Sequence, residues 1–139
     1  MENDVFSALM AKAREEPFAK KMGLRVLEVS RGYSRVAMTL TPEMENIFAM
    51  THGGAIFSLI DEAFEMASNS HGTAAVALNM NVTYITAPRQ GDTLQAEARE
   101  SSKTRKTAHY AITVHNGGGD LIATCSALVY RKDQPLSFL

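Results

Sequence analysis

The fold of this chain is decided by residues 52–70, which read HGGAIFSLIDEAFEMASNS. Apolar side chains recur in this stretch at the 3.6-residue spacing of a helix with one buried face, namely Ile56, Leu59, Ile60, Ala63, Phe64 and Ala67. A helix of this length spans roughly 28 Å. The opposite face carries four polar side chains, Ser58, Asp61, Glu62 and Glu65. The stretch therefore predicts one long helix with an apolar face to bury and an acidic face in solvent.

The chain on both sides of this helix reads mostly as strands. Before it, residues 3–16 predict a short amphipathic helix that Pro17 ends, and residues 24–40 predict a β-hairpin. After it, alternating apolar residues predict four antiparallel strands within residues 76–84, 94–98, 110–114 and 121–129. One sheet and one dominant helix make an α+β fold, and the simplest packing lets the twisted sheet curl round the helix.

Length and composition indicate a single small domain. The chain has 139 residues, 45% of them hydrophobic, and a formal net charge of −1 with scattered basic residues, which disfavours a nucleic-acid binder. Its one cysteine, Cys125, fits a reducing compartment. The acidic N-terminus is no secretory signal, and no apolar run approaches the roughly 20 residues that cross a bilayer. We expect a cytoplasmic protein without membrane or nucleic-acid partners.

The start of the long helix has the properties of an oxyanion-binding site. Backbone N–H groups at a helix N-terminus have no intrahelical acceptor, and the helix dipole adds partial positive charge there. Gly53 and Gly54 lie at this point and let another molecule approach the main chain. Thr51 or His52 would cap the helix. Such a tip polarises a carbonyl oxygen.

Asp61 is the candidate acid of the same helix, although a lone Asp on a helix is most often an ordinary solvated residue. Eight residues of helix separate it from Gly53 by about 12 Å along the axis. One short carboxylate does not reach a carbonyl held at the tip of its own helix. If both groups act on one substrate, they come from two chains, and a two-fold axis with antiparallel helices would bring each Asp61 to the other chain's Gly53.

The surrounding pattern resembles a known family, the PaaI-like (phenylacetate-degradation) thioesterases of the hotdog superfamily. The resemblance covers nearly the whole chain and is weakest before about residue 22. It rests on Asn46, His52-Gly53-Gly54, Phe57, Leu59, Asp61, Ala63-Phe64, Ala67 and Asn69-Ser70, followed by Asn81-Val82-Thr83-Tyr84, Pro88 and Gly91-Asp92-Thr93-Leu94. It implies a single hotdog domain over residues 1–139, with an N-terminal helix in about 1–20 and the core in about 22–132. It also implies a homodimer with shared active sites, assembled as a dimer of dimers (a homotetramer).

The resemblance implies hydrolysis of acyl-CoA thioesters, for example phenylacetyl-CoA or a related aryl-acetyl-CoA, to the free acid and CoA. Gly53 N–H would polarise the thioester carbonyl, while Asn46 and His52 would orient the substrate or the water. Asp61 of the partner subunit would be the general base or the nucleophile. The like charges of Glu62 and Glu65 would raise the pKa of Asp61. Coenzyme A is part of the substrate, and no cofactor or metal is implied.

Several residues are candidates for binding the substrate. Some relatives hold the attacking water with a Ser or Thr in the strand after the helix. In this chain that strand reads Val-Ala-Leu-Asn at residues 76–79. Either no residue holds the water here, or Asn79 does. Tyr84 would line the acyl tunnel, although core packing explains it equally well. The CoA phosphates would meet Lys103, Arg105 or Lys106 of the 101–107 junction, together with Arg89. The alternative is that this junction is an ordinary solvated turn.

Two other functions compete with the thioesterase. A non-catalytic acyl-CoA-binding or regulatory protein would have the same fold, since a fold does not fix chemistry. A hotdog hydratase is disfavoured because its pairing of a His with an acidic residue is not present. The remaining histidines and Cys125 lack the spacing of a zinc site.

Overall fold

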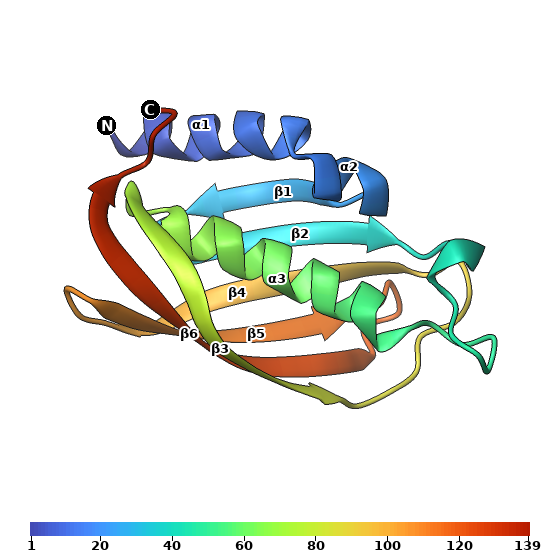
Figure 1. The fold of residues 1–139 in the computed structure, drawn as a ribbon. Coiled ribbons are helices and arrows are strands. Elements are labelled where there is room, and N and C mark those ends of the chain that lie inside the picture. The colour runs from blue at the N-terminus through green and yellow to red at the C-terminus, as the bar shows by residue number, and fades with distance from the viewer.

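The computed structural model describes residues 1–139, in which one long helix lies across the concave face of a curved sheet (Figure 1). The helix is α3, Gly53–Asn69. The sheet is antiparallel, has six strands and follows the order β1-β2-β4-β5-β6-β3. Its strands are β1 Arg25–Ser30, β2 Tyr33–Thr39, β3 Thr73–Tyr84, β4 Thr93–Lys103, β5 Thr107–His115 and β6 Leu121–Pro135. The predicted arrangement of a sheet around a central helix is confirmed.

The apolar face of α3 and the inner face of the sheet form the main core. Leu59, Ile60 and Ala63 are fully buried, as the 3.6-residue spacing predicts. Phe64 packs edge-on against Tyr110 of β5, with ring centroids 5.6 Å apart. The tyrosine hydroxyl donates a hydrogen bond to Glu100 Oε1 at 3.1 Å, so its polar end is satisfied inside the core. These contacts fix the rotation of α3 and therefore the direction in which each of its polar residues points.

The N-terminal region contains two helices where the sequence predicted one. Helix α1, Glu2–Glu15, ends just before Pro17 as expected. Pro17 then begins a second helix, α2, Pro17–Met22, which the sequence analysis missed. Proline is well suited to the first position of a helix because the N–H it lacks would have no partner there. Between the helices, Glu16 has extended backbone angles, which separates α1 from α2.

The strands after α3 run further than the alternation predicted. β4 extends to Lys103, so the β4–β5 turn contains only residues 104–106. β6 continues to Pro135 and pairs along nearly its whole length with β3. The last residues of β4 and β6 are more polar and exposed than the centres of these strands, and hydropathy patterning therefore underestimates their length.

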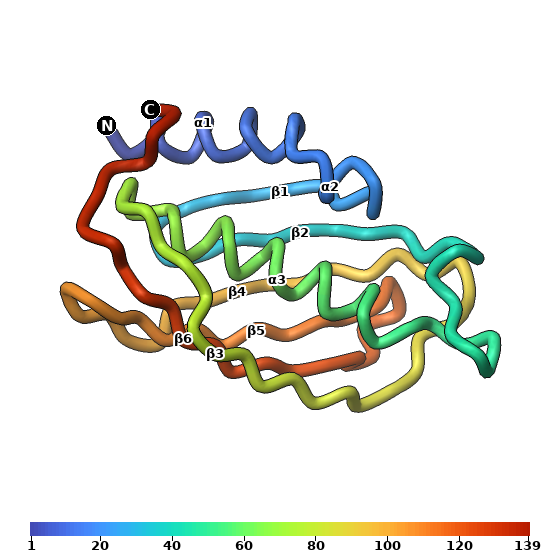
Figure 2. The backbone as a smooth tube through the Cα atoms, viewed as in Figure 1, coloured from blue at the N-terminus to red at the C-terminus, as the bar shows by residue number.

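The two edges of the sheet differ. β1 has six residues and lies beside α1, whereas β3 has twelve residues and pairs on one side only, with β6 (Figure 2). β3 also exposes large apolar side chains, with Val76 43% and Leu78 56% accessible. A long, unpaired strand with exposed apolar residues is suited to pairing with another chain. Among the helices, none combines the length and the apolar character that a membrane span requires.

Candidate active site

The tip of α3 presents a backbone N–H group without an acceptor, that of Gly53. His52 is the N-cap residue, and its Nδ1 accepts a 2.8 Å hydrogen bond from Gly54 N–H. The N–H of Ala55 is bonded to the His52 carbonyl oxygen. Gly53 N–H makes no hydrogen bond within the chain. Because Nδ1 of His52 accepts, the imidazole proton lies on Nε2, which leaves a second donor at the tip.

Tyr84, the last residue of β3, lies against the same tip. Its hydroxyl donates a 3.0 Å hydrogen bond to the carbonyl oxygen of Gly53. A Cβ atom on residue 53 would stand 3.2 Å from the tyrosine ring, so glycine allows this close approach. Gly53 and Tyr84 are separate candidates in the sequence, and the curl of the sheet brings them together.

Asn46 organises the loop that leads into α3. Its Oδ1 accepts hydrogen bonds from the N–H groups of Phe48 at 2.8 Å and Met50 at 3.2 Å. Its Nδ2 group makes no hydrogen bond in the chain and remains a free donor. The loop carries exposed apolar side chains, of which Ile47 is 92% accessible and Phe48 73%. The oxygen of Asn46 therefore shapes the loop, while its amide NH₂ is available to a ligand.

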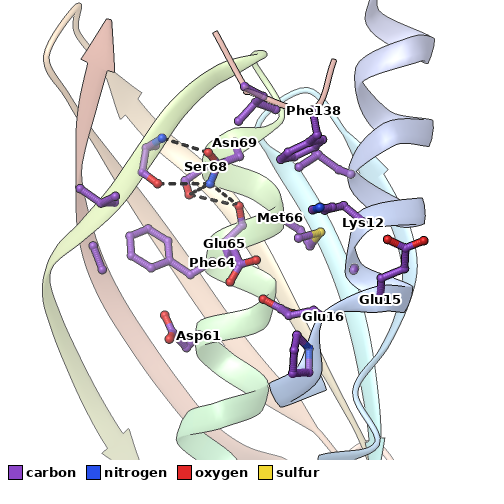
Figure 3. Close-up of a pocket in the computed structure, with 17 residues that line it drawn as sticks. Lys12, Glu15, Glu16, Asp61, Phe64, Glu65, Met66, Ser68, Asn69 and Phe138 are labelled. Carbon is purple, nitrogen blue, oxygen red and sulfur yellow. Dashed lines mark hydrogen bonds between the residues drawn. The ribbon is translucent and has the colours of Figure 1, made fainter. Parts of the chain in front are cut away.

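Asp61 lies on the middle of α3 and does not meet Gly53 of its own chain. Its side chain lines a cavity of about 640 Å³ between α1, α3, the start of β3 and the C-terminal tail (Figure 3). The cavity is largely apolar near Phe64, Val76 and Phe138. Desolvation, and then the negative charge of Glu16, raise the pKa of Asp61. The predicted direction is confirmed. The like charge that raises this pKa belongs to Glu16, which is distant in sequence, and the charge of Asp61 in turn raises the pKa of Glu62 and Glu65.

Comparison with known proteins identifies the family of this chain. Residues 48–123 match the family model described as the thioesterase superfamily. The chain belongs to the thioesterase superfamily. The predicted PaaI-like resemblance and the expectation of a thioester hydrolase are confirmed.

Relatives of this thioesterase are found in several organisms. A putative esterase of Archaeoglobus fulgidus is 44% identical over 110 residues, which are 79% of this chain and 71% of the relative. The acyl-coenzyme A thioesterase PaaI of Escherichia coli K12 is 38% identical over 98 residues, 70% of each chain. The structure of E. coli PaaI superposes with a TM-score of 0.92 at 29% identity and covers 98% of this chain and 99% of that one. A Streptococcus mutans protein solved with acetyl CoA gives a TM-score of 0.78 at 25% identity, over 81% and 91% of the two chains. The hotdog fold is confirmed by these similarities.

The acidic face of α3 in this thioesterase is not uniformly solvated, which corrects a prediction. Glu62 is only 4% accessible, because the α1–α2 junction packs over that flank of the helix. Burial, followed by a hydrogen bond with Glu16, raises the pKa of both Glu62 and Glu65 well above the ordinary range. Glu16 was not singled out from the sequence, since no local pattern links it to residues almost 50 positions later.

The predicted CoA-binding cations occupy two separate places in one chain. Arg89 lies in the loop before β4, where the neighbouring Gln90 donates a hydrogen bond to the carbonyl oxygen of Ala49 in the loop that leads into α3, whereas Lys103 is the last residue of β4. The two ends of β4 lie at opposite ends of the sheet (Figure 1). Ten residues of strand separate the two ends by roughly 33 Å. Arg105 forms a loose ion pair with Asp133 at 3.5 Å, while Lys103 and Lys106 are exposed and unpaired. A single chain therefore does not assemble these four residues into one binding site.

Asn79 faces away from the helix. Its Oδ1 accepts a 2.6 Å hydrogen bond from Asn81 Nδ2, so the two side chains share one face of β3. Met80 and Val82, between and beyond them, pack toward the core under α3. Side chains alternate along a strand, and Asn79 therefore lies on the opposite face from Tyr84. Within one chain it does not approach the tip of α3.

Proposed function

We propose that this chain hydrolyses acyl-CoA thioesters, with aryl-acetyl-CoA such as phenylacetyl-CoA as the substrate class, in active sites shared by two subunits. The observation that carries the proposal is the unpaired Gly53 N–H at the tip of α3, held between the His52 cap and the Tyr84 hydroxyl. Membership of the thioesterase superfamily and the similarity to the acyl-coenzyme A thioesterase PaaI support the reaction type. The relative solved with acetyl CoA supports a CoA ester as the ligand.

Gly53 polarises the thioester. Its N–H donates to the carbonyl oxygen, and the positive end of the α3 dipole adds to the stabilisation as that oxygen becomes negative. The free donors of Asn46 and His52, Nδ2 and Nε2–H, orient the substrate or the attacking water. When the C–S bond breaks, CoA leaves as the thiol and the acyl group leaves as the acid.

Asp61 of the partner subunit completes the site in one of two ways. As a general base it takes a proton from the attacking water and passes it to the departing sulfur; as a nucleophile it attacks the carbonyl carbon to form a mixed anhydride, which water then hydrolyses to the acid. The unpaired edge of β3 supports a dimer in which two such strands pair across a two-fold axis and the two α3 helices run antiparallel. In that arrangement the tip of one helix comes close to the middle of the other. The Asp61-lined cavity then offers space for the acyl group, and its apolar wall suits an aryl ring.

The same two-fold axis would bring the separated CoA-binding cations of two subunits together. Antiparallel pairing turns the β4–β5 turn of one subunit toward the helix tip of the other. Arg89 then approaches Lys103 and Arg105 of the partner subunit, and these cations can share the phosphates of one CoA. The dimer of dimers remains the proposed complete assembly.

The function is tested by following thiol release from a panel of acyl-CoA esters. We expect turnover that is fastest on aryl-acetyl esters, and a loss of about 100-fold or more in kcat for Asp61→Asn. Asp4→Asn, an equivalent change on the exposed face of α1, is the control and should keep full activity. Equal and negligible rates for wild type and Asp61→Asn would contradict the proposal that this chain hydrolyses acyl-CoA thioesters. Tight binding of the esters in that case would establish the non-catalytic acyl-CoA-binding protein.

A further inference from the structure

Three carboxylates meet where the N-terminal helices contact α3. Glu16 comes from the junction of α1 and α2, and Glu62 and Glu65 lie three residues apart on α3. Oxygen atoms of all three side chains lie within 4.8 Å of one another. Figure 3 shows Glu16 reaching from its junction toward α3 beside Glu65. Two segments far apart in sequence thus contribute ligands of one chemical type to one point.

The charges of these carboxylates have no counter-charge in the chain. None of the ion pairs of the protein includes Glu16, Glu62 or Glu65. Lys12 lines the adjacent cavity, but its ammonium group lies over the ring of Phe138, 5.7 Å from the centroid. Glu15 and Asp61, the other titratable residues of the cavity wall, are acidic as well. The cluster is therefore a group of carboxyls that no basic side chain of the chain neutralises.

One of the three side chains is buried, and one of its two carboxylate oxygens has no hydrogen-bond partner. Glu62 is 4% accessible, and its Oε2 atom makes no hydrogen bond; Oε1 of Glu16 is also buried without a partner. A buried carboxylate oxygen without a partner is costly, because it has lost its water and received nothing in exchange. Both atoms belong to the carboxylates of the cluster.

We propose that Glu16, Glu62 and Glu65 bind a hard divalent cation of the Mg²⁺, Ca²⁺ or Mn²⁺ class. These ions prefer oxygen ligands at about 2.0 to 2.6 Å, and oxygens that share one ion at that distance lie about 3 to 5 Å apart. The spacing of the three carboxylates agrees with this separation. The neighbouring cavity of about 640 Å³ has room for the waters that complete the coordination shell.

The electrostatics of the cluster favour such an ion. Desolvation raises the pKa of Glu62 and Glu65, and their contact with Glu16 raises both further. The carboxylates therefore require positive charge, which either protons or a cation supplies. A single divalent ion compensates all three groups at once and fastens the α1–α2 junction to α3. This inference concerns the stability of the fold and does not depend on the proposed thioester hydrolysis.

The test measures cation binding by the full chain in the absence of substrate. Protein treated with EDTA and then freed of it is titrated with MgCl₂, CaCl₂ and MnCl₂, and Tm and calorimetric heat are recorded. At least one cation should raise Tm by about 5 °C or more in a saturable way and bind with one site per chain. Glu62→Gln and Glu65→Gln should each abolish the shift. Glu15→Gln, which changes the same cavity wall outside the cluster, should retain it.

Two outcomes would overturn the proposal. One is the absence of a saturable shift with all three cations; a higher Tm of Glu62→Gln in EDTA would then assign the cluster to shared protons. The other is an equal shift in Glu15→Gln, Glu65→Gln and the wild type, which would show that the cation binds elsewhere. Because Glu65 is accessible, its variant remains informative if Glu62→Gln does not fold.

Discussion

The hydroxyl of Tyr84 donates a 3.0 Å hydrogen bond to the carbonyl oxygen of Gly53, so the end of β3 is tied to the first residue of α3. The N–H of Gly53 itself has no acceptor in the chain. The bond fixes the peptide that follows Gly53, and with it the direction of the helix tip. A strand that forms the edge of the sheet thereby positions the group proposed to polarise the thioester.

Removing this hydroxyl should weaken catalysis more than folding. Tyr84→Phe deletes a half-exposed hydrogen bond of about 1 kcal/mol, which corresponds to roughly a fivefold loss in kcat/KM if it holds the tip in place. Tyr130→Phe, a partly exposed tyrosine without a side-chain hydrogen bond, is the matched control and should have wild-type kinetics. Steady-state kinetics with one acyl-CoA ester measure both. Equal kcat/KM values for the two variants would show that the Tyr84 hydroxyl has no role in catalysis.

His52 is predicted to have two separable roles, as cap and as donor. His52→Ala should lower the free energy of unfolding by about 1 kcal/mol, because the Gly54 N–H loses its acceptor. His52→Asn restores a capping oxygen and should recover most of that stability. It lacks the Nε2–H donor, however, and its kcat should stay low. Urea unfolding and steady-state kinetics on the same preparations measure stability and kcat for each variant. Full recovery of kcat in the Asn variant would show that His52 acts only as the helix cap.

Deprotonation of Tyr110 should lower the free energy of unfolding at alkaline pH. Burial, followed by the negative charge of Glu100, raises the pKa of Tyr110 above its ordinary value of 10.0. Above about pH 10 the unfolded chain therefore releases this proton while the folded chain retains it, and stability falls as pH rises. Urea unfolding at pH 8.0 and about pH 10.5 should show a smaller fall for Tyr110→Phe than for wild type. Parallel losses in both proteins would contradict the assignment.

The central helix could be predicted from sequence because its signal is local. The spacing of Ile56, Leu59, Ile60 and Ala63 specifies both the helix and its buried face, and the structure buries all four. The glycine pair after His52 likewise specifies the tip, since N-terminal N–H groups lack partners in any helix. Local periodicity also placed Pro17 at the end of α1.

The contacts that the sequence analysis missed join segments distant in the chain. Glu62 reads as a solvated residue from its position on the helix wheel, and only the packing of the α1–α2 junction buries it. The partnership with Glu16 spans more than 40 residues, beyond any window of periodicity. The bond between Tyr84 and Gly53 likewise depends on how far the sheet curls round the helix. The chemical type of each site residue could therefore be predicted from the local sequence. Which of these side chains contact one another depends on tertiary structure and could not.

Mixing two inactive variants tests the shared active site most directly. Gly53→Pro removes the N–H at a helix position that tolerates proline, and Asp61→Asn removes the carboxylate; Gly53→Ala, which keeps the N–H, serves as the control for the added side chain. After subunit exchange, half of the dimers combine the two variants, and each of these contains one intact site. The activity of an equimolar mixture should therefore rise to about a quarter of the wild-type value. A mixture that exchanges subunits and stays inactive would contradict a site formed by Gly53 of one chain and Asp61 of the other.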